Sequence, residues 1–321
     1  MKVSIIMPVY NAAATLPHSL GSLLRQDFRN FEIVAVDDCS SDNSGEILKS
    51  FCDRNGIALN LIRHERNRGV AAARNTALDA AAGEYICWLD ADDALADGAL
   101  SEWVSTADDN RWEITGCEWY MTKAKSERYM VQAPFDTPEQ ALKNMMAGVM
   151  RWNLWLFLIR RDTVGDLRFV EGFNMGEDMT FMCRLFMASE RVGLIRKGYY
   201  HYWQNDQSVS RSFSEANIAQ VTANADLLAD SLRNSKYSGL ENPYMDFLKL
   251  NVKLPLLVTG RRSDFRRWRQ WWPESDSAAS ANNTLPARTR LLQVAAAKGL
   301  WPIVLLYTFL LNKIYYGIIY R

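Results

Sequence analysis

The chain has 321 residues, of which 48% are hydrophobic and 23% charged, and its formal net charge at pH 7 is zero. These values are ordinary for a folded globular protein of one large or two smaller domains, and they argue against whole-molecule electrostatic attraction to nucleic acid. The five cysteines are widely spaced and form no C-x-x-C pair, so the sequence favours free thiols in a reducing compartment over a zinc site or a disulfide framework.

Predicted strands and helices alternate through residue 90. Short apolar runs rich in β-branched residues predict strands over residues 2–10, 31–38, 58–65 and 85–90. Helical spacing of leucines, capping residues, alanine content and glycine stops predict helices over residues 14–26, 41–56 and 69–83. The first run follows a single lysine and soon reaches polar residues, so we interpret it as a strand and not as a signal peptide. The alternation predicts an α/β fold with a mostly parallel sheet flanked by helices, whose ligands bind beyond the carboxyl ends of the strands.

The pattern weakens beyond residue 99 and changes near residue 213. A further helix and strand are expected over residues 99–135, and residues 136–212 contain a helix and the tryptophan-bearing stretch MRWNLWLFLIRR. Only helices are predicted after that, so we divide the chain into an α/β domain over residues 1–212 and a helical region over residues 213–321. The segment 274–287 is polar, which predicts a flexible linker.

The predicted strand YICWLD leads directly into three carboxylates, Asp90, Asp92 and Asp93. Like charges this close repel, so a positive group is expected beside them. Residues i and i+2 of an extended segment point the same way, so Asp90 and Asp92 can face one ligand while Asp93 points elsewhere. A divalent cation bound to a nucleoside diphosphate fits, because such ions often use one or two carboxylates together with phosphate oxygens. A surface turn is the alternative, since Asp is a common turn residue.

Two further polar clusters follow predicted strands. Asp37 and Asp38 end the second strand, where carboxylates can accept hydrogen bonds from a base N–H and from ribose hydroxyls; helix N-capping is the alternative. The segment RNRGVAAARN, residues 66–75, places three arginines around a glycine turn and a helix start. That arrangement suits phosphates and planar bases, with a solvated basic loop as the alternative.

Five segments together resemble the inverting family 2 glycosyltransferases with the GT-A fold, of the kind that builds bacterial polysaccharide or lipopolysaccharide. In the family's order and spacing they are PVYN (8–11), VDDCSSD (36–42), NRGVAAARN (67–75), GEYICWLDADD (83–93) and GEDMTF (176–181). The resemblance covers roughly residues 1–212 and implies a GT-A, Rossmann-like α/β fold, with the helical region as a C-terminal extension. Cys39 departs from the pattern, because the family commonly has glycine after the paired Asp; we expect a slightly altered turn and an intact site.

The resemblance implies a role for each matching residue. Those that would contact the nucleotide-sugar donor are Pro8, Tyr10, Asn11, Asp37, Asp38, Asn67, Arg74, Asn75, Asp90 and Ala91. Asp92 would bind the divalent cation, Mn²⁺ or Mg²⁺. His201 is a candidate third metal ligand or diphosphate contact, although we prefer to interpret it as a satisfied histidine in an aromatic strand. Candidate stacking platforms for an acceptor sugar, with a core role as the alternative, are Trp152, Trp155 and Trp203.

Within GEDMTF, Asp178 matches the family's general base and Glu177 lies beside it. In an inverting transfer the acceptor hydroxyl attacks the anomeric carbon as the nucleotide leaves from the opposite face, and the hydroxyl must lose a proton as the bond forms. A positioned carboxylate can accept that proton, and a neighbouring acid can raise its pKa toward useful basicity. Without the family context, a helix start with favourable dipole charges would explain the same residues.

The C-terminal region has the composition of a segment that contacts a membrane surface. Residues 260–274 combine five arginines with three tryptophans and a phenylalanine, and residues 300–321 are almost wholly apolar, broken by Asn312 and Lys313. About 12 apolar residues precede that break, fewer than the roughly 20 needed to span a bilayer. We therefore expect an in-plane contact on the cytoplasmic side of the plasma membrane. A buried helix, a homodimer interface and, least favoured, a spanning helix are the alternatives.

These inferences predict a metal-dependent glycosyltransferase of cell-surface polysaccharide biosynthesis. Its donor would be a nucleotide-diphosphate sugar, with UDP the expected carrier, and its acceptor a hydroxyl of a glycan or lipid-linked molecule. A non-catalytic nucleotide-sugar-binding scaffold is the main alternative, disfavoured because all the expected acidic residues are present. A nucleotidyltransferase would need a glycine-rich N-terminal loop with Arg and Lys, and a Rossmann oxidoreductase a G-x-G-x-x-G after the first strand; neither motif occurs.

Overall fold

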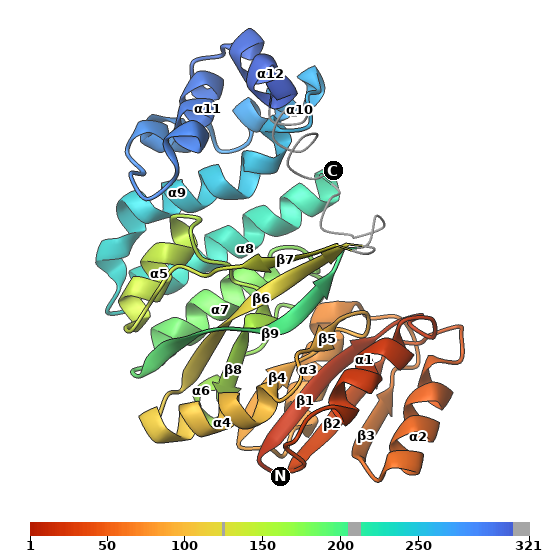
Figure 1. Cartoon of the computed structure of the whole chain (residues 1–321). Helices are drawn as coiled ribbons and strands as arrows, with labels where there is room; N and C mark the ends of the chain where they lie inside the picture. The colour runs from red at the N-terminus through yellow and green to blue at the C-terminus, as the bar shows by residue number, and fades with distance from the viewer. Residues whose placement is uncertain (124–125, 205–212, 311–321) are drawn as a thin grey trace. The chain divides into compact units, whose positions relative to one another are not determined.

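A computed structural model describes residues 1–123, 126–204 and 213–310 (Figure 1). The chain forms two compact units, residues 1–141 with 152–228 and residues 142–151 with 229–321. The boundary between them lies inside helix α8 (Glu215–Arg233), which begins just beyond the predicted division after residue 212. That division stays a prediction, because compactness alone does not test which residues act together.

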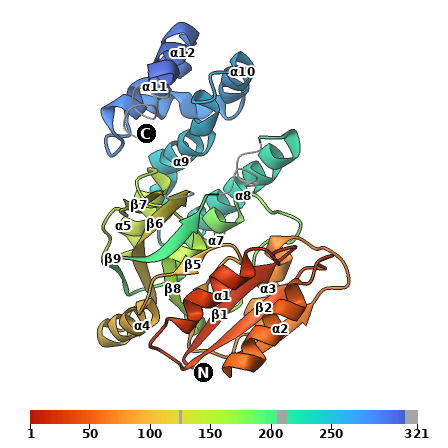
Figure 2. The ribbon, with the colours of Figure 1, turned by 45° about the vertical axis from the view of Figure 1, so that its right-hand side comes forward.

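The first part of the sheet is parallel and matches the predicted alternation. Its strands lie in the order β3 (Ala58–Arg63), β2 (Phe31–Asp37), β1 (Val3–Val9) and β4 (Tyr85–Trp88). The connecting helices, which flank these strands in Figure 2, are α1 (Leu16–Leu24), α2 (Ser44–Asn55) and α3 (Val70–Ala80). Each predicted element is confirmed to within three residues at either end, because apolar periodicity and capping are local signals.

The two predicted glycine stops behave differently. Gly56 ends α2 in the left-handed conformation, with φ of 63°, as predicted. Helix α3 ends earlier than predicted and is capped by Ala81 in an extended conformation, so the prediction that Gly83 ends this helix is wrong. Gly83 serves a close approach instead: a Cβ there would overlap the backbone of Ser4 in β1, and the Gly83 N–H donates to Ser4 Oγ at 2.8 Å.

Beyond β4 the sheet becomes mixed. β8 (Phe157–Arg160) pairs antiparallel with β4 and with β6 (Ile114–Lys123), and β6 pairs parallel with β9 (Val192–Trp203). The short strands β5 (Ala94–Leu95) and β7 (Ser126–Met130) pair antiparallel with β9 and β6. The α/β class with flanking helices is confirmed, and the parallel arrangement holds over the first four strands. Antiparallel additions are common in large α/β sheets, because they need no crossover helix.

The remaining helices of the N-terminal unit pack around this sheet. They are α4 (Ala99–Asn110), η1 (Leu154–Leu156), α6 (Arg161–Val164) and α7 (Glu177–Ala188), while α5 (Pro138–Met146) and α8 cross the boundary between the units. The core lies between the strands and these helices, where Ile5 and Ile6 of β1 and Phe186 of α7 are fully buried. α7 matters most for the site, because its first turn carries the predicted catalytic acids.

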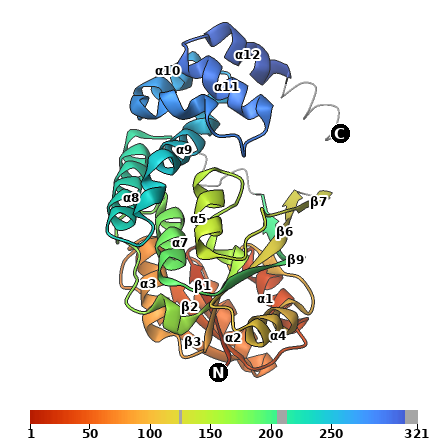
Figure 3. The same ribbon diagram turned by 90° about the vertical axis from the view of Figure 1, so that its left-hand side faces the viewer.

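The C-terminal unit is built of helices (Figure 3). They are α9 (Glu241–Lys253), α10 (Arg262–Gln270), α11 (Ala287–Ala297) and α12 (Trp301–Leu310), with the 3-10 segments η3 (Ser238–Leu240), η4 (Leu254–Leu257) and η5 (Pro273–Ser280). Among the helices of the three described ranges, none combines the length and the apolar character that crossing a membrane requires.

The prediction of a flexible linker over residues 274–287 is wrong. Most of its first half forms η5, and Ser275 and Asn282 are buried. The fully buried Lys253 anchors the segment, because its Nζ donates to Asp276 Oδ1 at 2.8 Å and to two main-chain carbonyls just before η5 at 2.9 and 3.1 Å. Composition could not reveal this anchor, since Lys253 lies 23 residues before its carboxylate partner.

Candidate functional site

The carboxyl ends of β2, β1 and β4 lie side by side at one edge of the parallel part of the sheet (Figure 1). Asp37 is in register with Val9, and the Asp38 N–H donates to Val9 O at 2.8 Å. On the other side of β1, the Leu89 N–H donates to Ile6 O at 3.0 Å. The polar segments that follow these three strands therefore meet at one edge, as the sequence predicts.

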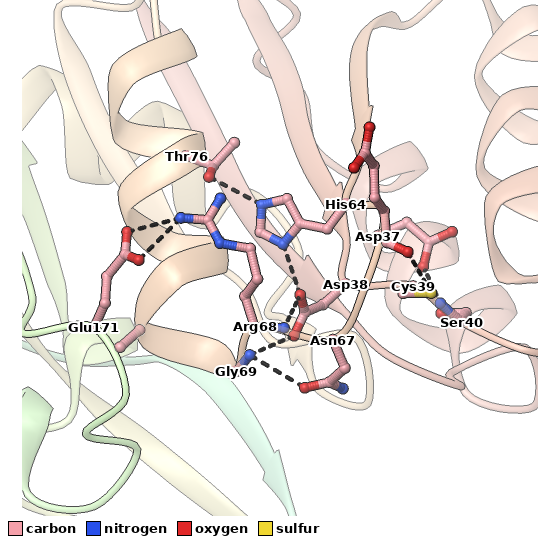
Figure 4. A network of polar contacts seen from close by, with 12 residues as sticks. Asp37, Asp38, Cys39, Ser40, His64, Asn67, Arg68, Gly69, Thr76 and Glu171 are labelled. Atoms are coloured by element: carbon pink, nitrogen blue, oxygen red, sulfur yellow. Dashed lines mark hydrogen bonds and ion pairs between the residues drawn. The ribbon is translucent and has the colours of Figure 1, made fainter.

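Asp38 organises the loop that enters α3 (Figure 4). Its Oδ1 accepts from the His64 Nδ1–H at 2.6 Å and from the Arg68 N–H at 2.9 Å, and its Oδ2 accepts from the Gly69 N–H at 2.8 Å. His64 is buried, and its Nε2 lies 3.0 Å from Thr76 Oγ1 on α3. Both oxygens of Asp38 are engaged within the protein, so its contact with a nucleotide stays a prediction. Sequence reasoning missed His64, whose only signal was its place at the end of a predicted strand.

Asp37 and Asn11 shape the turn after β2. Asp37 is 1% exposed and accepts from the Ser40 N–H at 2.7 Å and from Arg63 Nη1 at 3.0 Å. Asn11 Oδ1 accepts from the Ser41 N–H at 2.8 Å, and the Asn11 N–H donates to Ser40 Oγ at 3.0 Å. Asp37 and Asn11, both predicted to contact the nucleotide-sugar donor, therefore already make hydrogen bonds within the protein. These bonds fix the loops on either side of the strand ends.

Cys39 stands where the family commonly has glycine. Its φ is 65°, in the left-handed region, which costs a residue with a Cβ roughly 1 kcal/mol or more. Its side chain is half-buried, with Sγ 3.6 Å from Glu65 O. The turn therefore keeps a conformation that glycine adopts without strain, and the substitution is accommodated at an energetic cost.

Four other residues predicted to contact the nucleotide-sugar donor lie near the same edge of the sheet. Pro8 is half-buried in β1, and Tyr10 just beyond it is 55% exposed, so its ring is accessible for stacking on a planar base. Asn67 Oδ1 accepts from the Gly69 N–H at 3.2 Å, which supports the start of α3. Ala91 is buried in the turn after β4. Of this group, Tyr10 is the residue that offers a ligand an exposed aromatic ring.

A buried arginine joins the NRGVAAARN motif to the acids of α7. Arg74 is 7% exposed and donates from Nη1 to Glu177 Oε1 at 2.9 Å and to Asp178 Oδ1 at 2.6 Å. Both acids lie on the first turn of α7, which follows Gly176 in the left-handed conformation, with φ of 78°. Arg74 thus forms one cluster with Glu177 and Asp178, which lie 103 and 104 positions further along the chain. Spacing in the sequence could not predict this proximity.

Electrostatic interaction extends this cluster to Asp90. Burial raises the pKa of Asp90 to about 6; Arg74 opposes the shift, while Asp92 and Asp178 add to it. Burial also raises the pKa of Glu177 to about 7, with Asp178 adding to the shift and Arg74 opposing it. Burial lowers the pKa of Arg74, but the neighbouring carboxylates outweigh burial and the net pKa is raised. Arg74 Nε is buried without a hydrogen-bond partner. The acids outnumber the single arginine, which favours binding of a further cation.

Helix α3 is tied to the segment that precedes α7. The Asn75 amide donates from Nδ2 to Phe169 O and accepts from the Phe169 N–H, both at 2.9 Å. Arg68 Nη2 donates to both carboxylate oxygens of Glu171, at 3.0 and 2.9 Å (Figure 4). Because its amide is engaged by main chain, Asn75 positions the segment that leads to α7, and its own contact with the donor stays a prediction.

Asp93 is buried and points into the protein interior. The Tyr200 hydroxyl donates to Asp93 Oδ2 at 2.9 Å and accepts from the Asp90 N–H at 3.1 Å, while the Trp203 N–H donates to Asp93 Oδ1 at 2.7 Å. Burial raises the pKa of Asp93 well above its usual range. Tyr200, which sequence reasoning missed, thereby fixes the turn that leaves Asp90 and Asp92 half-buried at the end of β4.

Asp90 and Asp92 have the chemistry of a hard-cation site. Their ligand atoms are oxygens, and a cation would relieve the repulsion from Asp92 and Asp178 that adds to the effect of burial on the pKa of Asp90. Within the described residues, no group of three or more His, Cys, Asp or Glu is arranged to hold a metal ion by itself, so the pair fits a cation that takes further ligands from a diphosphate and water. His201 Nδ1 lies 2.7 Å from Glu127 Oε1 and its ring stacks on Tyr120 at 4.7 Å, so its role as a metal ligand stays a prediction.

The three candidate tryptophans lie in different environments. Trp155 is 5% exposed and its ring stacks on Tyr200 at 4.3 Å, which supports the core alternative for this residue. Trp203 is half-buried and meets His18 edge-on at 4.9 Å, and Trp152 is half-buried. Trp152 and Trp203 therefore remain the candidates for contact with an acceptor sugar.

Sequence comparisons place this geometry in context. Residues 4–176 match the model of the family described as Glycosyl transferase family 2. The uncharacterized glycosyltransferase EpsJ of Bacillus subtilis is 32% identical over 217 residues, which cover 65% of this chain and 62% of EpsJ. The poly(ribitol-phosphate) beta-N-acetylglucosaminyltransferase TarS of Staphylococcus aureus is 30% identical over 210 residues, which cover 63% of this chain and 35% of TarS. The chain thus spans less than two thirds of the length of either relative.

Solved structures share the fold over nearly the whole chain. S. aureus TarS 1–349 in complex with UDP-GlcNAc aligns with a TM-score of 0.71 at 21% identity, covering 98% of this chain and 92% of that one. The mannosyltransferase PcManGT from Pyrobaculum calidifontis, in complex with GDP-Man and Mn²⁺, aligns with a TM-score of 0.58 at 20% identity, covering 96% and 85%. Likeness at such identities establishes the fold and not the substrate.

Proposed function

Since the chain belongs to glycosyltransferase family 2, we propose that it is an inverting, metal-dependent glycosyltransferase whose donor is a nucleotide-diphosphate sugar. The proposed carrier is UDP, supported by the UDP-GlcNAc and UDP complexes of TarS. The proposed acceptor is a hydroxyl of a glycan or lipid-linked molecule in cell-surface polysaccharide biosynthesis. Relatives whose names refer to poly(ribitol-phosphate) and to teichoic acid support an acceptor of this class.

The observation that carries the proposal is the buried cluster of Arg74, Glu177 and Asp178 beside Asp90. In the proposed reaction Asp178 accepts the proton of the acceptor hydroxyl as the hydroxyl oxygen attacks the anomeric carbon. The bond from that carbon to the nucleotide oxygen breaks on the opposite face, so the configuration inverts. We assign the base to Asp178 because it matches the family's general base, and its side chain is also the more exposed of the two acids, 17% against 11%. Arg74 orients it through the 2.6 Å ion pair.

Asp92 is the proposed ligand of Mn²⁺ or Mg²⁺, and Asp90 beside it is proposed to contact the ribose and sugar hydroxyls of the donor. A divalent cation, when bound there, would neutralise the charge that develops on the departing diphosphate. The buried, unpartnered Arg74 Nε is a further donor that an anionic ligand can satisfy. In the same proposal the exposed Tyr10 ring stacks on the base, while Asp37 and Asp38 hold the loops that enclose it.

We also propose that the protein works in the cytoplasm at the inner face of the plasma membrane, where a lipid-linked acceptor would be concentrated. A homodimer remains a prediction. The main alternative function, a nucleotide-sugar-binding scaffold without activity, differs in one measurable respect: it would bind donor and release no nucleotide.

The test is a panel of nucleotide sugars scored for metal-dependent release of the nucleoside diphosphate. Asp92→Ala is expected to lose metal-dependent release, and Asp178→Asn to bind donor normally while transfer falls at least about 100-fold. Asp109→Asn, an exposed acid on α4, is the matched control and should behave as wild type. Normal transfer by both site variants would refute the assigned roles. Donor binding by the wild-type protein without release for any sugar would favour the scaffold.

A further inference from the structure

Among residues 213–310, helix α12 has an apolar face with large exposed side chains. On its packed side, Val304 and Thr308 are buried, and Thr308 Oγ1 donates to Leu257 O at 3.0 Å. Its exposed apolar side chains, each between 42% and 58% accessible, are Ile303, Leu305, Leu306, Phe309 and Leu310. So many adjacent aliphatic and aromatic side chains on one short helix mark a contact surface rather than scattered exposure.

Helix α10 runs beside α12 in the opposite direction. Near its start, Gly260 lies against Thr308, so that a Cβ on the glycine would sit 3.8 Å from Thr308 Cγ2. Midway along, the rings of Phe265 and Trp301 are 5.1 Å apart. At its end, the Arg269 guanidinium lies against Gly299. A Cβ on that glycine would be 3.2 Å from Arg269 Nη1. Both helices belong to the helical group of the C-terminal unit in Figure 3, and these three contacts connect α10 and its flanking residues to α12 and to the turn before it.

The outer side of α10 is strongly basic. Asp264, Phe265 and Trp268 face inward and are buried. The exposed arginines on and just before the helix are Arg261, Arg262, Arg266 and Arg269. A cationic row thus runs along a helix that contacts α12 through Phe265 and Trp301. This pairing of guanidinium groups with exposed apolar side chains is the pattern of a helix that lies at a lipid–water interface.

We propose that the apolar face of α12 and the arginine row of α10 form one docking surface for an anionic lipid bilayer. Because one side of α12 packs on the C-terminal unit through Val304 and Thr308, the helix would meet a bilayer with its opposite, apolar side and lie in the plane of the interface. Lipid phosphates would pair with the arginines. A second copy of this chain is a poorer occupant, because a two-fold contact would bring the two arginine rows toward each other. The docking surface rests on the proposed function in one respect: a lipid-linked acceptor would explain why the enzyme binds a membrane.

The test is co-sedimentation of the full chain with vesicles of phosphatidylglycerol and phosphatidylcholine, or of phosphatidylcholine alone. We expect binding to the anionic vesicles only. Arg262→Gln with Arg266→Gln should weaken it about 30-fold, since each basic group near an anionic surface contributes close to a factor of five. Leu306→Ser with Phe309→Ser should weaken it more than about 10-fold. Matched controls in the N-terminal unit are Lys49→Gln with Arg54→Gln, and Val131→Ser, all exposed; these should bind like wild type.

Two kinds of result would overturn the docking surface. One is equal binding to both kinds of vesicle, or no binding at all. The other is vesicle binding by the Leu306→Ser/Phe309→Ser protein that equals that of wild type. If that variant is also a monomer while wild type is a dimer, α12 is a contact between copies of the chain and not a membrane surface. Nucleotide release measured on the same samples separates the two proposals. Vesicle binding without release would leave the surface intact and refute the proposed function.

Discussion

Replacing Arg74 by Gln removes the one positive charge in the buried acidic cluster. Its ion pairs to Glu177 and Asp178, at 2.9 and 2.6 Å, connect side chains that are each less than one fifth exposed. Removing one partner of a buried ion pair costs about 3–5 kcal/mol, because the remaining charge is left uncompensated. We therefore expect Arg74→Gln to lower the free energy of unfolding by about 3–5 kcal/mol at pH 8.

The free energy of unfolding that Arg74→Gln removes should depend on pH in a defined direction. The pKa values of Glu177 and Asp90 in the folded protein, about 7 and about 6, lie above their ordinary values of 4.5 and 3.8. Groups with raised pKa values contribute most to stability at low pH, and this contribution is lost as pH rises through about 6 to 7. Without Arg74 both pKa values should rise further, because the opposing charge is gone. The loss of stability in the variant should therefore be smaller at pH 5 than at pH 8.

Urea unfolding at pH 5, 6.5 and 8 measures this directly, provided the dependence on urea concentration is unchanged. Arg68→Gln is the matched control, since Arg68 also pairs with a carboxylate, that of Glu171, but the pair is 40% and 50% exposed. Its loss should cost less than about 1 kcal/mol at every pH. Equal costs for the two variants, or a cost for Arg74→Gln that does not change with pH, would refute the view that Arg74 compensates these acids.

Three further predictions concern the turn after β2, the C-terminal anchor and the metal. Cys39→Gly should raise the free energy of unfolding by about 1 kcal/mol, because φ is 65° there; a lower urea midpoint would contradict this. Lys253→Met should lower the free energy of unfolding, measured by heat or urea, by about 3 kcal/mol, because it leaves three acceptors without their buried donor. The control Lys249→Met, whose partner Glu274 is 56% exposed, should lower it by less than about 1 kcal/mol. Similar losses for the two variants would argue against the anchor. EDTA should abolish nucleotide release and Mn²⁺ should restore it, while full activity in EDTA would exclude the proposed cation at Asp92.

Much of the parallel half of the fold can be predicted from the sequence, because its signals are local. β1 to β4 and the helices between them follow from apolar runs and capping residues, and the five ordered segments led to the family that the comparisons confirm. The antiparallel direction of β8 could not be predicted, since it depends on pairing Tyr85 with Arg160 across the sheet. Lys253 made the linker prediction fail for the same reason: its acceptors are distant in sequence.

The site shows the same limit. Asp90, Asp92, Arg74 and Asp178 could be selected as candidates from residue type and order, but not their arrangement. The contact of Arg74 with Asp178 spans 104 residues, and that of Asp38 with His64 spans 26. These contacts arise from tertiary packing, which brings the start of α3 against the start of α7 and against the end of β2. A single sequence carries no signal for such distances.

A crystal structure of the protein with UDP-sugar and Mn²⁺ would show whether Asp92 and Asp178 have the proposed roles. We predict Mn²⁺ between the Asp92 carboxylate and the diphosphate oxygens, with Asp178 within hydrogen-bonding reach of the site opposite the departing nucleotide. Mn²⁺ bound away from Asp92, or Asp178 on the same side of the sugar as the diphosphate, would contradict it.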